Sequence, residues 1–251
     1  HNLDPAPSED IFSLYISYQS AFINPRTVSS YLSGICHALE PDFPHVREVR
    51  RSPLVVRTLR GAMRSRGSAI QRVPAITTAD LRAVLNSYDN CISFDTSLFL
   101  TILLTGFFGL LRLGEITAPS NPLFIDPSKQ VRRSSIALTS STYEFFLPAN
   151  KTDPFFEGNH IIIRSTTDDI NPYPHFISYL SLRDARFPFH TQLFLTSHGE
   201  VPTEHWFLAK LHQHLPKVFG AQSLRAGGAT WLASIGTDSA QIQALGCWSS
   251  D

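Results

Sequence analysis

The chain has 251 residues, of which 43% are hydrophobic and 17% are charged, and its formal net charge is zero. This composition is typical of a globular, soluble protein with enough length for one large domain or two smaller ones. No apolar run reaches the roughly 18 residues that a membrane-spanning helix needs, so we expect no membrane partner.

The three cysteines are scattered along the chain and form no CxxC pair; they are Cys36, Cys91 and Cys247. A disulfide framework and a cysteine-based zinc site are therefore not expected, and a reducing, intracellular compartment fits the pattern. The histidines of residues 205–214 lack the HExxH spacing and suitably placed carboxylates. We interpret them as solvated surface residues and expect no metal site.

Two helices are predicted in the N-terminal part, and each begins with an N-cap residue followed by proline. These starts are Asn24–Pro25 and Ser52–Pro53. On an ideal helix, three arginines of the second helix fall within an arc of roughly 60°, opposite its apolar residues. They are Arg57, Arg60 and Arg64. This helix therefore has an apolar back and an arginine face.

Positive charge is concentrated in residues 45–72, which hold eight arginines against one glutamate and so carry a net charge of +7. Arginine makes up 17 of the 21 basic residues of the chain, and its guanidinium suits bidentate contact with phosphate. A basic block in a chain of zero net charge indicates a local anionic partner.

A linker is predicted at residues 67–82, where Gly, Ser and Pro lead into Thr77-x-x-Asp80, a start that resembles a capping box. We therefore place a domain boundary near residue 73, with an all-helical domain over 1–73 and a second domain over 74–251. Helices are expected in the second domain over 78–88, 95–112, 172–187, 203–215, 223–235 and 239–245. The last has Asp238-x-x-Gln241 as its cap and Gly246 as its stop.

Three β-rich runs separated by turn residues, at 134–140, 142–148 and 159–165, predict a small antiparallel sheet in the second domain. The expected fold class is mainly α with a small antiparallel β-sheet, an α+β arrangement.

Four side chains of the second domain stand out by their surroundings. Arg112 lies in an apolar segment, Lys151 in the turn of a predicted hairpin, Arg225 at a helix start and Trp248 just past a helix end. Each has a purely structural explanation. Arg112 could pair with Glu115 at i,i+3, Lys151 could be an exposed hairpin lysine, Arg225 could bridge core elements, and Trp248 could serve packing.

The four structural explanations are less convincing when the residues are considered together. Two arginines in apolar contexts need an anionic partner, because an unpaired buried charge costs several kcal/mol. Glu115 can satisfy one of them at most. A phosphodiester would satisfy both with bidentate geometry.

These segments, in this order and at these separations, resemble the tyrosine recombinase (phage integrase) family. The phrases KTDPF, SLRAGGAT and GxWSSD are most similar to the recombinases of fungal mobile elements of the Crypton type. The likeness covers nearly the whole chain. Residues 1–73 resemble the family's DNA core-binding domain, and residues 74–251 resemble its catalytic domain.

The resemblance implies a role for each of these residues. Arg112 and Arg225 would clamp the non-bridging oxygens of the scissile phosphate, and Glu115 would support Arg112. Lys151 would protonate the departing 5′ oxygen, and Trp248 would pack on the phosphate and hydrogen-bond to it. The family uses a tyrosine nucleophile, forms a 3′-phosphotyrosine and needs no metal or other cofactor.

The resemblance also implies double-stranded DNA as the partner. The arginines expected to bind the DNA are Arg47, Arg50, Arg51, Arg57, Arg60, Arg64 and Arg66. The family works as tetramers on DNA, often by exchanging C-terminal helices. We therefore expect a tetramer on DNA if that segment is present and a monomer without it. The resemblance also implies an intracellular, nuclear location.

Two departures from the family pattern matter. Gln222 stands where the family usually has histidine, and an amide cannot shuttle a proton. The last tyrosine is Tyr179, so we expect the nucleophile on a helix beyond Asp251.

Three hypotheses follow: a DNA strand-transfer enzyme of a mobile element, a catalytically inactive DNA-binding protein derived from that fold, and a helical scaffold without a nucleic-acid role. The arginine face counts against the third.

Overall fold

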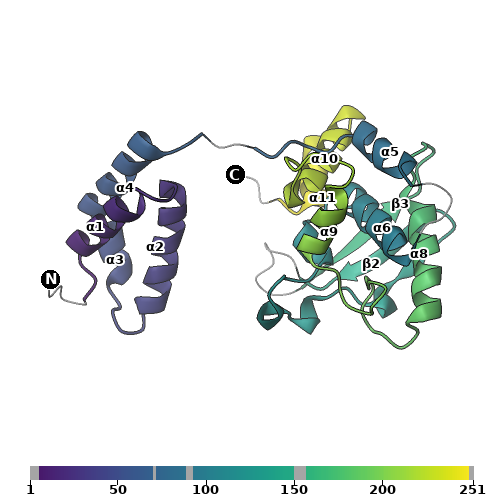
Figure 1. Cartoon of the computed structure of the whole chain (residues 1–251), viewed down its shortest axis with the longest axis horizontal. Helices are drawn as coiled ribbons and strands as arrows, with labels where there is room; N and C mark the ends of the chain where they lie inside the picture. The colour runs from purple at the N-terminus through teal and green to yellow at the C-terminus, as the bar shows by residue number, and fades with distance from the viewer. Residues whose placement is uncertain (1–5, 70–71, 89–92, 150–156, 249–251) are drawn as a thin grey trace. The chain divides into compact units, whose positions relative to one another are not determined.

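The fold is described from a computed structural model that covers residues 6–69, 72–88, 93–149 and 157–248. The chain divides into two compact units, His1–Arg72 and Val73–Asp251 (Figure 1). Each unit has its own hydrophobic core. Lys151, Cys91 and residues 249–251 lie outside the described residues.

The first unit is helical throughout its described part. Its helices are α1 (Glu9–Gln19), α2 (Pro25–Leu39), α3 (Val46–Arg51) and α4 (Pro53–Arg66). The side chains of Asn24 and Ser52 accept hydrogen bonds from the first turns of α2 and α4, as the Asn-Pro and Ser-Pro pairs predict. The core is formed by apolar residues from all four helices, and it holds Phe12, Ile16, Val28, Leu32, Cys36, Val46 and Val55.

The second unit is mostly helical with one small sheet, which confirms the predicted fold class. Its α-helices are α5 (Thr78–Asn86), α6 (Phe94–Phe108), α7 (Leu113–Ile116), α8 (Pro172–Arg186), α9 (Glu204–Leu211), α10 (Ala221–Ser234) and α11 (Ser239–Gly246). Three 3-10 turns join α7 to the sheet: η1 (Pro122–Phe124), η2 (Pro127–Lys129) and η3 (Arg133–Ser135). The strands are β1 (Ala137–Leu138), β2 (Thr142–Leu147) and β3 (Asn159–Arg164).

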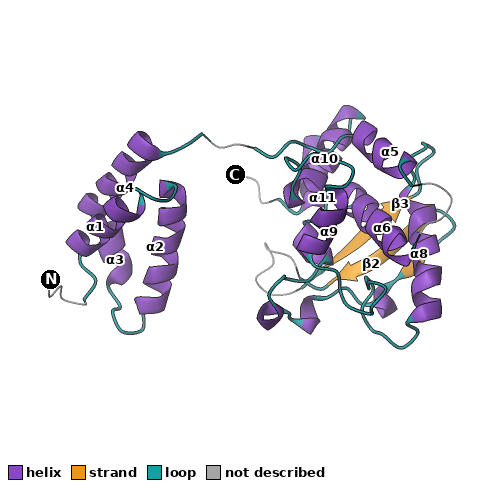
Figure 2. Cartoon of the chain, viewed as in Figure 1, coloured by secondary structure: helices purple, strands orange, loops and turns teal. Residues whose placement is uncertain are grey.

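The strands form an antiparallel sheet in the order β1-β2-β3, and helices cover its inner face (Figure 2). Alternate residues of β2 are buried, as the two-residue period of a strand requires. Tyr143 stacks on Phe176 of α8, with ring centroids 3.8 Å apart. Its hydroxyl lies 2.9 Å from the Thr105 hydroxyl of α6, so one strand residue joins both covering helices.

Helix α6 is the centre of this unit, and nearly all of its residues are buried. It ends at Phe108, so the expectation of one helix over 95–112 was wrong at its C-terminal end. The chain turns at Gly109, and Leu110 takes a left-handed conformation with φ of 50°. Arg112 consequently lies in extended backbone before the short helix α7.

The stop of α11 also differs from the expectation. Gly246 still belongs to the helix, and Cys247 is the residue in the left-handed conformation, with φ of 50°. Asp238 caps the helix through the amide of Ala240. Helix α10 begins at Ala221, two residues before the expected start, so Arg225 lies in its second turn.

Helix α10 approaches the rest of the core through two glycines. A Cβ atom on Gly227 would lie 2.1 Å from the carbonyl oxygen of Ile76, and one on Gly228 would lie 2.0 Å from that of Phe107. No Cβ tolerates such distances, so only glycine lets α10 lie directly on the backbone of α6. This close packing fixes the position of Arg225.

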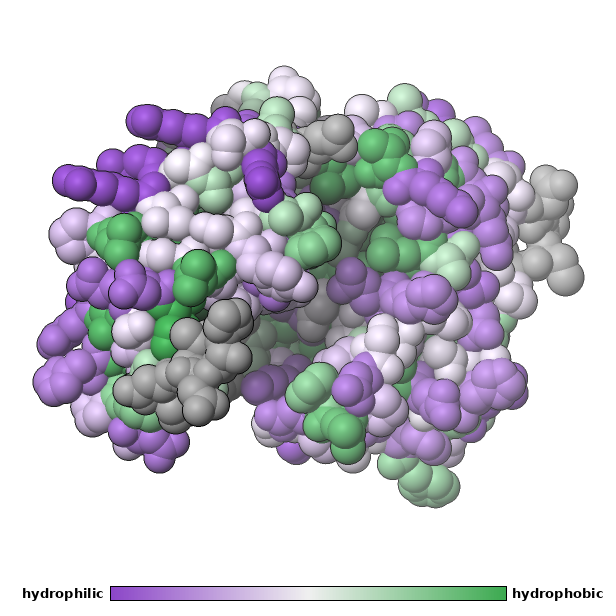
Figure 3. Space-filling view, turned by 60° about the vertical axis from the view of Figure 1, so that its left-hand side comes forward, coloured by the Kyte–Doolittle hydropathy of each residue, from purple (hydrophilic) through white to green (hydrophobic). Residues whose placement is uncertain are grey.

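The visible surface is largely hydrophilic, with scattered apolar patches (Figure 3). Within the described ranges, no helix combines the length and the apolar character that crossing a bilayer requires.

We predict that Gly228→Ala separates α10 from α6 and lowers the free energy of unfolding by about 2 kcal/mol or more, because the added methyl group meets a backbone carbonyl. Urea denaturation followed by circular dichroism measures the change. The control is Gly114→Ala in the same unit, where nothing lies within 4 Å of an added Cβ. The control should be neutral or slightly stabilising, and an equal loss in both variants would contradict the packing argument.

Candidate functional site

Arg225 is a buried charged residue of α10 and is 9% exposed. Its Nη1 donates a hydrogen bond of 2.7 Å to the carbonyl of Leu110, and its Nη2 donates to the carbonyl of Gly246. These acceptors come from the ends of α6 and α11, so the guanidinium joins three helices. No carboxylate in the described residues forms an ion pair with it.

Trp248 covers the Arg225 guanidinium. The central guanidinium carbon lies 4.7 Å from the centroid of the indole ring, which is the geometry of a cation–π contact. The left-handed turn at Cys247 brings the ring back over Gly246, where a Cβ would meet it at 2.8 Å. The backbone amide of Trp248 also donates to the carbonyl of Gln243.

Arg112 is paired with Glu115, as its i,i+3 spacing allows. Its Nη1 lies 2.9 Å from one carboxylate oxygen, and its backbone amide donates to the other oxygen at 2.8 Å. The Glu115 side chain is nearly buried at 9% exposed, whereas that of Arg112 is 28% exposed. One carboxylate therefore fixes both the backbone and the side chain of Arg112.

The two arginines are electrostatic neighbours. Burial lowers the pKa of Arg225 from its ordinary value, the positive charge of Arg112 lowers it further, and Glu115 opposes both effects. The site thus holds two guanidinium groups against one carboxylate, which leaves one positive charge in excess. An anion is the partner that this imbalance favours.

Gln222 lies one turn before Arg225 on α10, and residues three apart lie on one helix face. Its side chain is exposed. Lys151 lies outside the described residues, but the strands on either side of it form the predicted antiparallel hairpin, with Leu147 paired to Asn159. Asn159 reaches the cluster, because its Nδ2 lies 3.7 Å from Cys247 Sγ.

Sequence reasoning missed the two left-handed residues beside Arg225. Leu110 supplies one of the carbonyls that hold the guanidinium, and Cys247 directly follows Gly246, which supplies the other. Neither is a glycine, asparagine or aspartate, the usual signals for this conformation. The turn at Leu110 was therefore not predicted, and the stop of α11 was predicted one residue early, at Gly246.

The arginines expected to bind DNA differ in their contacts. Arg47 forms a bidentate pair with Glu40, at 2.6 and 2.7 Å, and Arg50 donates to the carbonyl of Ser29. Both therefore attach α3 to its neighbours. The remaining side chains are exposed, and they are Arg51, Arg57, Arg60, Arg64 and Arg66.

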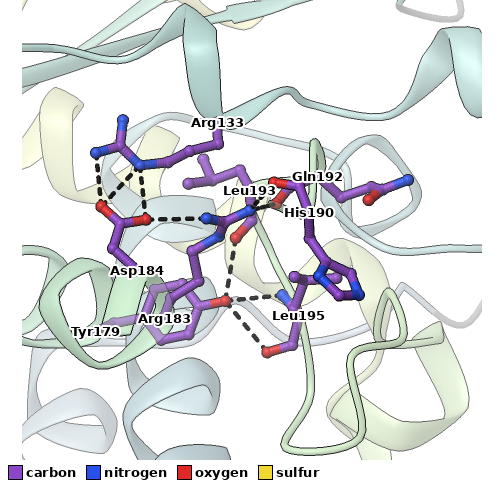
Figure 4. Close-up of polar contacts among 8 residues, drawn as sticks. All are labelled: Arg133, Tyr179, Arg183, Asp184, His190, Gln192, Leu193 and Leu195. Carbon is purple, nitrogen blue, oxygen red and sulfur yellow. Dashed lines mark hydrogen bonds and ion pairs between the residues drawn. The ribbon is translucent and has the colours of Figure 1, made fainter. Parts of the chain in front are cut away.

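A buried charged cluster in the second unit was also missed (Figure 4). Arg183 of α8 is 1% exposed, and its guanidinium binds Asp184 and the carbonyls of His190 and Gln192. Asp184 also receives a bidentate contact from Arg133. Both arginines thus form an ion pair with Asp184, and the cluster is a structural brace that joins η3, α8 and residues 190–192.

No group of three or more His, Cys, Asp or Glu side chains is arranged to hold a metal ion within the part of the chain that the structure describes.

The second unit, with its small antiparallel sheet packed against helices, has the fold of the tyrosine recombinase catalytic domain. The Tn1549 transposon integrase in complex with transposon right end DNA matches with a TM-score of 0.60 and 14% identity. This match covers 100% of this chain and 80% of that chain. A lambda integrase dimer bound to a COC′ core site matches with a TM-score of 0.51 and 11% identity, over 99% of this chain and 80% of that one.

The XerH site-specific recombinase bound to its difH substrate matches with a TM-score of 0.51 and 13% identity, over 91% of this chain. The chain spans 64% of the length of that recombinase. No protein-family model matches the chain, and no curated protein matches it. The comparisons show the fold, and they do not show the Crypton-type likeness.

We predict that inorganic phosphate at low ionic strength raises the melting temperature of the protein, because the excess positive charge at Arg112 and Arg225 favours an anion. Arg112→Gln should reduce this rise. Arg164→Gln, which removes an exposed arginine at the other end of the sheet, should keep it. Differential scanning calorimetry measures the shifts, and an equal rise in both variants would place the anion elsewhere.

Proposed function

We propose that this chain belongs to a site-specific DNA recombinase or integrase that cleaves and rejoins DNA through a 3′-phosphotyrosine intermediate. One observation carries the proposal. Arg225 is buried beside Arg112 without a carboxylate of its own. A phosphodiester supplies the missing negative charge, and its two non-bridging oxygens match the donors of two guanidinium groups.

In the proposed reaction, a tyrosine hydroxyl attacks the scissile phosphorus, and the bond from phosphorus to the 5′ oxygen breaks. Arg112 and Arg225 stabilise the charge that develops on the non-bridging oxygens. Lys151 gives a proton to the departing 5′ oxygen. Trp248 shields one face of Arg225 and offers its indole N–H to the phosphate.

The nucleophile in this proposal is a tyrosine beyond Asp251. The covalent bond to tyrosine conserves the energy of the phosphodiester, so the cut strand can be joined to a new partner. The reaction as proposed needs no metal or other cofactor, because arginine side chains carry out the charge stabilisation.

The exposed arginines of the first unit hold the duplex in this proposal. Arg51, Arg57, Arg60, Arg64 and Arg66 are free to reach phosphates, whereas Arg47 and Arg50 serve mainly to support α3. Such contacts with the backbone position a protein on DNA without reading its sequence.

The sequence resemblance supports three finer parts of the proposal. The element served is a fungal mobile element of the Crypton type, the protein acts in the nucleus, and it assembles as a tetramer on DNA when its C-terminal segment is present.

A second candidate function is DNA binding without catalysis, and Gln222 is the observation that favours it. An exposed amide at this place on α10 can hold a phosphate oxygen but cannot transfer a proton. Loss of one acid–base group costs about 10²–10⁴ in rate.

We predict that the affinity for non-specific duplex DNA falls with salt, with a slope of about −0.9 for each phosphate contact. Replacing Arg57, Arg60 and Arg64 together by glutamine should weaken binding and make the slope shallower. The control is Arg47→Gln, whose guanidinium is already bound to Glu40. Fluorescence anisotropy measures both quantities, and a salt-independent affinity would remove DNA from the function.

We predict that the full-length protein forms a covalent adduct with a suicide DNA substrate, and that changing the nucleophilic tyrosine to phenylalanine abolishes it. Arg225→Ala should also abolish the adduct while most non-specific affinity remains. Arg225→Lys keeps a cation and tests whether loss of activity follows from unfolding. A gel that separates free and DNA-bound protein under denaturing conditions detects the adduct. Its absence on the proper target would favour the binding-only function.

A further inference from the structure

A hollow of about 300 Å³ lies at the carboxyl end of β2, outside the Arg112 and Arg225 cluster. Arg132 and three serine side chains line it, together with Phe146 and Pro148. The serines are Ser128, Ser134 and Ser135. Because residues alternate along a strand, Phe146 faces away from its buried neighbours Phe145 and Leu147. The hollow therefore lies on the outer face of the sheet.

The backbone at Arg132 is held firmly although its side chain is exposed. The neighbouring Arg133 reaches inward to Asp184, as Figure 4 shows, and its amide donates to the carbonyl of Thr191. The Ser135 hydroxyl donates to the carbonyl of Arg132 and accepts from the amide of Phe146. The η3 turn is thus attached on one side to α8 and on the other to β2.

The Arg132 guanidinium makes no hydrogen bond or ion pair with any other described residue. Asp126, the carboxylate beside the η2 turn, is already engaged. Asp126 accepts from both the amide and the hydroxyl of Ser128 and pairs with Lys129 at 3.5 Å. The Ser128 and Ser135 hydroxyls already donate to Asp126 and to the Arg132 carbonyl. The hollow therefore combines the exposed Arg132 guanidinium with one further hydroxyl donor, that of Ser134, and both groups can bind phosphate oxygens.

The hollow lies at the same end of the sheet as the candidate site. Pro148 directly follows β2, and its neighbour Leu147 pairs with Asn159. Asn159 contacts Cys247, which follows the Gly246 carbonyl that holds Arg225. Because adjacent strands lie only about 4.8 Å apart, the hollow and the cluster are on either side of the same end of the β2–β3 hairpin, where Leu147 pairs with Asn159.

We propose that the hollow around Arg132 binds a backbone phosphate of the duplex, separate from the scissile phosphate. This inference rests on the proposed function, because it assumes that a duplex lies on the Arg112 and Arg225 cluster. Arg132 and the Ser134 hydroxyl would then position the duplex on the second unit, independently of the arginines of the first unit.

The test compares Arg132→Gln with Arg164→Gln in the full chain. Arg164 is an exposed arginine at the opposite end of β3, so its removal changes the net charge equally. Arg132→Gln should weaken binding of a non-specific duplex about three- to tenfold and reduce the salt slope by about one contact. Arg164→Gln should bind like the wild type. Thermal melting checks that both variants remain folded.

A second measurement does not depend on affinity. Ser134→Cys should form a disulfide with duplex DNA that carries a thiol tethered to its backbone, whereas Ser141→Cys, exposed at the other end of β2, should not. Equal cross-linking of the two would overturn the inference.

The outcomes separate this inference from the proposed function. If the wild type does not bind duplex DNA, the proposed function fails. If the wild type binds and the first-unit variant loses affinity, while Arg132→Gln binds like the wild type, only the hollow's role fails. If Arg132→Gln loses a thermal shift caused by inorganic phosphate but keeps its duplex affinity, the hollow holds a free anion, which also overturns the inference.

Discussion

Helix α10 lies so close to α6 that no side chain fits between Gly228 and the carbonyl of Phe107. The candidate site depends on this contact. It places Arg225 beneath the turn at Leu110, where the chain leaves α6, and beside the end of α11. A helix displaced by the width of a methyl group would move the guanidinium away from both carbonyls. The glycines that follow Arg225 in the sequence contact the backbone of Ile76 and of α6, and these contacts fix where the Arg225 guanidinium lies.

The way in which each arginine is held decides what it can do. Arg183 and Arg133 each form an ion pair with the same carboxylate, that of Asp184, and Arg183 also donates to two carbonyl oxygens. Arg225 has only dipoles and a ring as partners, and these orient a cation without neutralising it. Two kinds of buried arginine therefore occur in one unit. The first kind is held by a carboxylate, and the second is held by carbonyl dipoles and an indole ring.

Much of the architecture could be predicted from the sequence because its signals are local. Proline after an N-cap located α2 and α4, and β-rich runs between turn residues located β2 and β3. The end of α6 could not be predicted, because Leu110 has a left-handed backbone that its side chain disfavours. The brace at Arg183 was also beyond reach, since its partners His190 and Gln192 lie in a segment without periodicity.

In the candidate site, too, the contacts within one turn could be predicted and the contacts between elements could not. The sequence indicated that Arg112 pairs with Glu115, because the two are three residues apart. It also placed Arg225 in an apolar context. It could not show that Arg47 is bound to Glu40, since this contact depends on how α3 packs against α2. Contacts between elements require the tertiary structure, whereas contacts within one turn do not.

The two left-handed residues beside Arg225 have different consequences for how the chain can vary. Leu110 is 2% exposed and packs against α10, so the apolar contact of its side chain offsets the cost of its backbone. Cys247 is only half-buried, and its thiol contacts the Asn159 side chain at 3.7 Å. Position 110 therefore requires a large apolar side chain, whereas glycine or asparagine at position 247 would adopt the left-handed backbone at lower cost but would give up the thiol contact with Asn159.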